Sequence, residues 1–184
     1  MKIITFFIFI FLFTVTIITE LYLSKLGLGD PVRYDSNFIY GYAPKENQSK
    51  IRLKGSRVTI NDVGLRSVIN WRNNNNKKII IFGDSITYGG SYIDDKETFS
   101  YLICKKTENY ICGNAGVNAY SIINMVMRSR FDKRYGDVDK IVFLVAPGDF
   151  YRDYADSQTA HFYLNKKNFF LPAIMEALSF VATR

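Results

Sequence analysis

The sequence is poor in the residues that metal sites need. Its 184 residues include one histidine, His161, and two cysteines, Cys104 and Cys112, with no Cys-x-x-Cys pair. No spacing typical of a metal site is therefore present, and we expect neither a metal nor another cofactor. The cysteines lie eight residues apart, which is compatible with a disulfide in an oxidising compartment or with two buried free thiols.

Blocks of like charge are missing as well. The formal net charge is +7, from 24 Lys and Arg against 17 Asp and Glu, but no five or six like charges follow one another. Basic arms that bind nucleic acid normally contain such blocks, so we expect a solvated basic surface and no nucleic-acid partner. Hydrophobic residues make up 48% and aromatic residues 16% of the chain, which predicts a packed core. The length suits one ordinary domain with an appendage.

One long apolar run opens the chain. Residues 3–19 carry no charge over 17 positions, and further apolar residues follow Glu20. This length is close to the minimum for a helix that spans a bilayer. A cleaved signal peptide is the alternative, but its apolar region is usually shorter and ends in small residues, whereas large side chains and Lys25 follow here. We therefore expect residues 1–23 to form a retained single-pass transmembrane signal anchor, whose balanced flanking charges leave its orientation open.

Residues 24–76 show no sustained helical or strand period, and glycine and proline interrupt them repeatedly. We interpret them as an irregular lead-in. It is expected to pack through its aromatic side chains, which are Tyr34, Phe38, Tyr40 and Tyr42. The polar run of residues 72–78 is of low complexity and predicts a loop into the first strand of the main domain. That domain is assigned to residues 77–184.

Three apolar segments of the main domain are typical of buried strands. In Ile79–Phe82, four apolar residues follow one another and three are β-branched, which favours a doubly covered strand over a short buried helix. Tyr110–Cys112 and Lys140–Val145 are predicted as the second and third strands. Helical segments separate them, so the pattern predicts βαβ units and a parallel sheet. Right-handed crossovers then bring the loops after all three strands to one edge of the sheet.

Two helices are predicted between these strands, and one near the end of the chain. Asp94 and Glu97 have capping-box spacing before the first, Ser121 can cap the second, and Pro172 can start the third. The apolar side chains of the first two helices are expected to face the core. They are Phe99, Leu102 and Ile103, then Ile122, Ile123, Val126 and Met127.

The three loops at the sheet edge are GDS at 83–85, GNAGVNAYS at 113–121 and APGDF at 146–150. Ligands of open α/β sheets bind in the crevice beyond the carboxyl ends of the strands. Gly83 can make the sharp turn that ends its strand, which would leave the hydroxyl of Ser85 at this crevice. Ordinary turn chemistry would also explain the Gly-Asp-Ser triplet.

Together these loops resemble those of SGNH/GDSL-type hydrolases, a family of flavodoxin-like α/β esterases and acylhydrolases. The resemblance implies a three-layer parallel sheet of strand order 2-1-3-4-5, with Ser85 as the nucleophile. It also implies that the N–H of Ala119 is an oxyanion donor beside that of Ser85, while Asn114 and Gly116 shape the loop. Acyl transfer needs such a hydroxyl and such donors. Residues 61–66, NDVGLR, resemble a lead-in motif of membrane-anchored relatives.

The sequence departs from this family in two places. Gly148 stands where the family has an asparagine, and losing such an oxyanion donor costs about 3–4 kcal/mol of transition-state stabilisation. The family's final Asp-x-x-His element is not found, because His161 has Gln158 three residues before it; a structural role is favoured for this histidine. We therefore expect the domain to lack its C-terminal strands. The third strand would then be an open apolar edge, unless the tail helix covers it.

These observations lead to two hypotheses for the function. The first is a membrane-anchored serine esterase or acylhydrolase on the extracytoplasmic side, which forms a Ser85 acyl-enzyme and needs no cofactor. Its partner would be a small acyl ester or an acylated polysaccharide, such as O-acetyl groups on the cell surface, and transfer to an acceptor sugar is a variant of this reaction. The second is a non-catalytic, membrane-tethered binding or scaffold protein, a truncated pseudoenzyme of the same fold.

Overall fold

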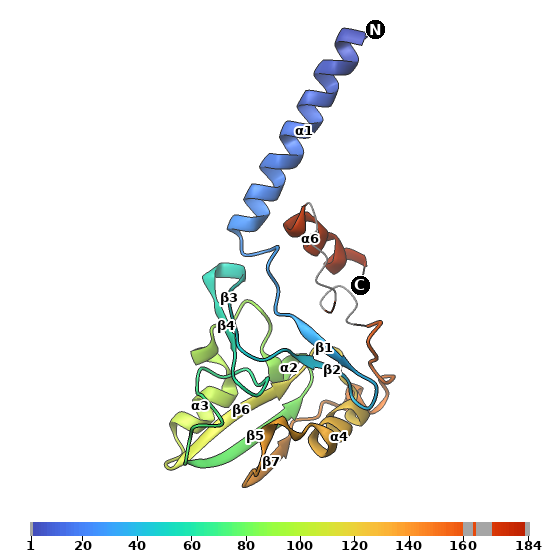
Figure 1. Ribbon diagram of the computed structural model, residues 1–184. Coiled ribbons are helices and arrows are strands. Elements are labelled where there is room, and N and C mark those ends of the chain that lie inside the picture. The colour runs from blue at the N-terminus through green and yellow to red at the C-terminus, as the bar shows by residue number, and fades with distance from the viewer. Residues whose placement is uncertain (1, 160–163, 165–170, 183–184) are drawn as a thin grey trace.

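One long helix projects from a mixed α/β body (Figure 1). The computed structural model describes residues 2–159, 164 and 171–182. The helix, α1, spans Lys2–Lys25, and most of its apolar side chains are exposed. Its segment Ile3–Lys25 has a mean hydropathy of 2.4, so α1 is long and apolar enough to cross a membrane. This finding agrees with the predicted anchor and leaves its orientation open.

The centre of the body is a parallel sheet with the strand order β6-β5-β7. Its strands are β5 (Lys77–Gly83), β6 (Tyr110–Gly116) and β7 (Lys140–Phe143). β5 lies in the middle with residues 79–83 buried, which confirms the strand predicted from its unbroken apolar run. β6 continues four residues further than predicted. Gly113 lets the lead-in pack closely against this strand, since a Cβ on it would lie 2.3 Å from Leu65 Cδ1.

Helices connect the sheet strands. The two predicted helices are α3 (Phe99–Lys105) and α4 (Ile122–Phe131), and a further short helix, α2 (Ser85–Tyr88), directly follows β5. Short 3-10 turns occur at Leu53–Gly55 (η1), Asp95–Glu97 (η2), Lys133–Tyr135 (η3) and Pro147–Phe150 (η4). The capping box of Asp94 and Glu97 is present, but it caps η2, and Thr98 caps α3 instead. Ser121 precedes α4 as expected.

The face of α4 that is buried differs from the predicted one. Ile123, Val126 and Met127 are exposed, whereas Asn124 and Arg128 are fully buried. These two polar side chains are stabilised by several hydrogen bonds to backbone carbonyls, which apolar periodicity does not reveal. The expected apolar face of α3 is likewise not buried: Leu102 and Ile103 are exposed and Phe99 is half-buried.

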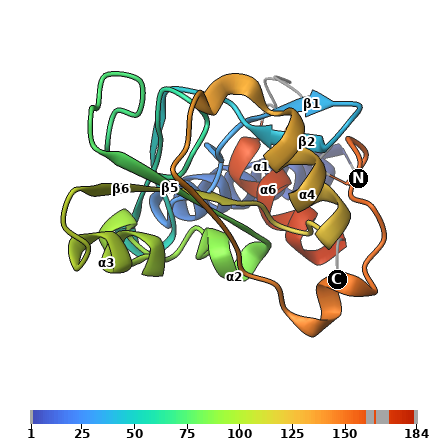
Figure 2. The same cartoon turned by 90° about the horizontal axis from the view of Figure 1, so that it is seen from below.

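The lead-in is more regular than predicted. It forms two antiparallel pairs, β1 (Tyr34–Asn37) with β2 (Gly41–Pro44) and β3 (Gln48–Ile51) with β4 (Arg57–Ile60). Strands of four residues are too short to show a clear period in the sequence. The β1–β2 hairpin lies beside α4 (Figure 2), where Asn124 Nδ2 donates to Tyr40 O at 3.2 Å. Tyr34, Tyr40 and Tyr42 are buried as expected, but Phe38 is 94% exposed at the hairpin turn.

The helix α6 (Pro172–Ala182) begins at the predicted proline and packs beside α1, away from the sheet (Figure 1). Glu20 of α1 accepts hydrogen bonds from the N–H groups of Ala173 and Ile174, both at 2.9 Å, so its carboxylate caps α6. α6 therefore does not cover β7. Within the described ranges, no strand pairs with the outer edge of β7, whose side chains are exposed, as expected for an open edge.

The two cysteines form a disulfide. Cys104 near the end of α3 is bonded to Cys112 in β6, with their Cα atoms 5.7 Å apart. This decides between the two alternatives that the spacing left open. The bond fastens α3 to the side of the sheet opposite β7.

Candidate functional site

The loops after β5, β6 and β7 meet at one end of the sheet, as the parallel order requires. Gly83 pairs with Gly116 in register, and Val117 N donates to Gly83 O at 3.1 Å. On the other side, Leu144 N donates to Phe82 O at 2.8 Å. The predicted convergence of the GDS, GNAGVNAYS and APGDF segments is therefore found.

Ser85 lies just past the carboxyl end of β5, and its side chain is exposed. Asp84 holds the start of α2, because its Oδ1 accepts a hydrogen bond from Ile86 N at 2.9 Å. The turn requires glycine at position 83, since a Cβ there would lie 1.8 Å from Thr87 Oγ1 and 2.9 Å from Leu144 O. The chain therefore bends sharply and presents the Ser85 hydroxyl to solvent.

Ala119 lies on the neighbouring loop in a strained conformation. Its φ is +65°, a left-handed value that costs a residue with a side chain about 1–2 kcal/mol. Within the described residues, neither its N–H nor that of Ser85 donates a backbone hydrogen bond outside regular elements. Asn114 connects this loop to α2, because its Nδ2 donates to Thr87 O at 2.6 Å and its Oδ1 accepts from Gly116 N at 2.9 Å. Strain in a non-glycine residue of this kind often marks a functional loop.

Arg152 connects all three loops, and the sequence reasoning missed it. Its Nη1 donates to Tyr120 O at 2.8 Å and lies 3.5 Å from Asp84 Oδ2 and 3.2 Å from Asp149 Oδ1. Asp149 is fully buried, and its Oδ2 accepts from Ala146 N at 2.8 Å. The one available signal was the position of Arg152, three residues after the aspartate of the third loop. The guanidinium brings a positive charge to the residue next to Ser85.

Gly148 leaves the third loop without a side-chain donor. It lies in η4, and a Cβ placed on it would have no atom within 4 Å. The position is therefore open and not a tightly packed turn. Arg152, four residues further on, is the cationic side chain beside this loop.

The motif at residues 61–66 supports the site from the lead-in. Arg66 is buried, and its Nη1 donates to Tyr88 O at 2.8 Å and to Gly90 O at 2.6 Å. Its Nε donates to Asp95 Oδ1 at 3.1 Å. Asn61 Oδ1 accepts hydrogen bonds from the N–H groups of Val63 and Leu65. These bonds stabilise the turn that precedes Arg66 and so position its side chain. This motif therefore holds the end of α2, the short helix that Ser85 begins.

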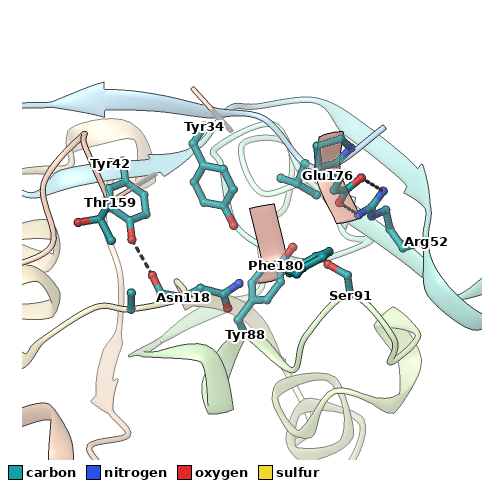
Figure 3. Close-up of a pocket in the computed structure, with 12 residues that line it drawn as sticks. Tyr34, Tyr42, Arg52, Tyr88, Ser91, Asn118, Thr159, Glu176 and Phe180 are labelled. Carbon is teal, nitrogen blue, oxygen red and sulfur yellow. Dashed lines mark hydrogen bonds and ion pairs between the residues drawn. The ribbon is translucent and has the colours of Figure 1, made fainter. Parts of the chain in front are cut away.

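A cavity of about 360 Å³ lies between these loops, the lead-in and α6 (Figure 3). It is lined by Pro31, Val32, Tyr34, Tyr42, Arg52, Tyr88, Ser91, Asn118, Ala119, Thr159, Glu176 and Phe180. Ser85 is not part of the lining, but the expected oxyanion donor Ala119 is, and so is Tyr88 at the other end of α2. The rings of Tyr34, Tyr88 and Phe180 converge on the cavity (Figure 3).

The described side chains place no general base beside Ser85. His161 lies outside the described residues. No described side chain hydrogen-bonds to Ser85 Oγ, and the described residues contain no cluster of His, Cys, Asp and Glu that could hold a metal ion. The hydroxyl, the two amide donors and Arg152 are thus the chemical groups that the described chain brings to this edge.

Comparison with protein-family models found no family that matches the chain, and comparison with curated proteins found no relative.

Proposed function

We propose that this protein is a serine esterase or acylhydrolase of the SGNH/GDSL type, anchored to a membrane by α1. The observation that carries the proposal is the placement of Ser85. Its exposed hydroxyl stands at the carboxyl end of the central strand, beside a loop whose strained Ala119 N–H donates no backbone hydrogen bond within the described residues. The strand order β6-β5-β7 corresponds to the first three strands of a flavodoxin-like sheet, which supports the same assignment.

In the proposed reaction, Ser85 Oγ attacks the carbonyl carbon of an ester. The N–H groups of Ser85 and Ala119 stabilise the oxyanion, and the alcohol leaves with the proton that the serine has lost. Water then cleaves the acyl-enzyme and regenerates the hydroxyl, or a sugar hydroxyl accepts the acyl group. His161, as the only histidine of the sequence, is the first side chain to test as the proton carrier. Acetyl groups on a surface polysaccharide are a suitable substrate.

The disulfide supports an extracytoplasmic location for the domain. Disulfides persist in oxidising compartments and are rare in the cytosol, so the bond between Cys104 and Cys112 favours the outer side of the membrane. The charges that flank α1 do not decide the orientation, and the disulfide is therefore the stronger argument.

A non-catalytic binding protein of the same fold is the second candidate. It is favoured by Gly148, which offers no side-chain donor, and by the lack of a described partner for Ser85 Oγ. Such a protein would use the crevice and its arginine to bind a ligand without cleaving it.

Hydrolysis of 4-nitrophenyl acetate by the full chain in lipid nanodiscs separates the two candidates. We expect turnover that Ser85→Ala reduces to the background rate, because the nucleophile is lost. Ser129→Ala is the matched control, since it makes the same change on α4, away from the crevice. Equal rates for the parent protein and Ser85→Ala would exclude the esterase.

A further inference from the structure

The cavity beside Ala119 has a buried, mainly apolar floor and a partly exposed rim. Val32, Tyr34 and Tyr88 form part of the floor and are each at least nine-tenths buried. Phe180 at the rim is 42% exposed, and Asn118 is exposed as well. A volume of about 360 Å³ falls in the ordinary range of small-molecule sites, and such a lining suits an apolar ligand.

The charged residues in the wall do not favour a charged ligand. Arg52 and Glu176 form a buried ion pair with each other. Arg52 Nη1 also donates to Gly27 O at 2.7 Å, and Glu176 Oε2 accepts from Gly29 N at 2.6 Å. The two charges therefore compensate each other within the wall and join it to the segment that leaves α1.

One wall of the cavity belongs to the element nearest to the candidate membrane span. Phe180 lies on α6, which packs beside the C-terminal part of α1 in Figure 1 and is capped there by Glu20. The exposed side chains of α6 include Leu178 and Val181, at 56% and 75%. A short helix with exposed apolar side chains, next to the end of a transmembrane helix, is suited to the interface of a bilayer.

We infer that the cavity binds the acyl chain of a membrane lipid, which enters from the bilayer beside α6. The chain would lie along the rings of Tyr34, Tyr88 and Phe180, and its carbonyl end would reach Ala119 at the cavity wall. Placing the ester carbonyl at Ala119 rests on the proposed function, whereas binding of the lipid acyl chain in the cavity does not. This narrows the proposed function, because the cavity favours a lipid acyl ester over an acetylated sugar as the substrate of Ser85.

Photocrosslinking in a bilayer tests the site directly. The full chain carrying Ser85→Ala, so that no turnover intervenes, is placed in nanodiscs that contain a trace of a phosphatidylcholine with a diazirine in one acyl chain. After irradiation, mass spectrometry maps the adducts. We expect adducts on cavity peptides that contain Val32, Tyr88 and Ala119, in addition to those on α1.

A blocking variant makes the result specific. Ser91→Phe puts a ring into the cavity wall and is expected to reduce the cavity adducts at least tenfold while those on α1 persist. Ser129→Phe, on α4 and outside this lining, should leave both sets unchanged. Fluorescence of the buried Trp71 verifies that both variants fold. Adducts confined to α1 and α6, or cavity adducts that persist in folded Ser91→Phe, would overturn the inference.

The outcomes for binding and for catalysis are distinguishable. If cavity adducts form but the parent chain hydrolyses no ester, the lipid-binding site is supported and the esterase proposal is refuted. Turnover of 4-nitrophenyl acetate by Ser85 without cavity adducts would refute the lipid site alone.

Discussion

Arg152 Nη1 lies 3.2 Å from Asp149 Oδ1, which places a half-exposed cation against a carboxylate that is fully buried. The same nitrogen lies 3.5 Å from Asp84 Oδ2 and donates to Tyr120 O, so one side chain fastens the three loops of the candidate site. A buried carboxylate without a counter-charge is strongly destabilising. Arg152 is therefore important to the shape of the site whatever reaction takes place there.

Replacing Arg152 tests this arrangement. Arg152→Ala leaves Asp149 as an uncompensated buried charge, and we expect unfolding to become easier by about 1–3 kcal/mol. Asp149→Asn in the same chain should recover most of this loss, because the amide oxygen can still accept from Ala146 N. Unfolding is followed through Trp71, the only tryptophan, which is 1% exposed. Equal destabilisation of the single and double variants would contradict the role of the ion pair.

The close approach of α2 to β6 gives a second prediction. A Cβ on Gly116 would lie 2.3 Å from Tyr88 N and 2.7 Å from Thr87 C, and backbone atoms cannot move aside as a side-chain end can. We expect Gly116→Ala to cost about 3 kcal/mol or more in the free energy of unfolding. Gly148→Ala is the matched control and should be close to neutral, because nothing lies within 4 Å of its Cβ position. Similar stabilities of the two variants would show that this contact is not tight.

The disulfide offers a prediction about redox conditions. Cross-linking Cys104 to Cys112 closes a short loop, for which the chain-entropy account gives about 2–3 kcal/mol. A reductant should therefore lower the midpoint of denaturant unfolding of the parent chain. The double variant Cys104→Ser, Cys112→Ser should already unfold at the lower midpoint and should not respond to the reductant. A midpoint that is the same in the parent and in the double variant would refute the stabilising role.

The lowered pKa of the Asp132 carboxyl leads us to expect a loss of folding stability in acid. Burial alone would raise the pKa of its carboxyl, but hydrogen bonds from Arg134 and the charge of Arg128 outweigh burial and lower that pKa to about 2. The ordinary value is 3.8, so the ionised carboxylate stabilises the folded state above about pH 4. This stabilisation, about 2 kcal/mol, is lost as the pH falls from about 4 to 2.

The measurement is the unfolding free energy between pH 5 and 2, compared with that of Asp132→Asn. The variant should be less stable at pH 5, and the difference from the parent should shrink toward pH 2. A constant difference over this range would mean that another group causes the acid sensitivity.

The framework of the fold could be predicted because local signals and tertiary structure agree. The unbroken apolar run of Ile79–Phe82 favours a strand that is covered on both faces, and it lies in the central strand of the sheet. Ser121 and Pro172 marked the starts of two helices through capping and backbone geometry that act over a few residues. The position of Ser85 at the end of β5 followed from the same local reasoning.

What the sequence did not reveal depends on contacts between distant segments. The buried face of α4 contains Asn124 and Arg128, because their side chains hydrogen-bond to backbone carbonyls of distant segments. The role of Arg152 depends on three loops that are distant in the sequence and meet around its guanidinium in the fold. The exposure of Phe38 likewise depends on where the β1–β2 hairpin turns, which its composition does not determine.

Covalent labelling of the serine tests the central claim most directly. The full chain in nanodiscs is treated with a fluorophosphonate, which phosphonylates activated serines as fluoride leaves, and the modified peptide is identified by mass spectrometry. The account predicts one adduct, on Ser85, which disappears in Ser85→Ala and persists in Ser91→Ala. Failure of Ser85 to react, in a chain whose Trp71 fluorescence shows that it is folded, would contradict the account.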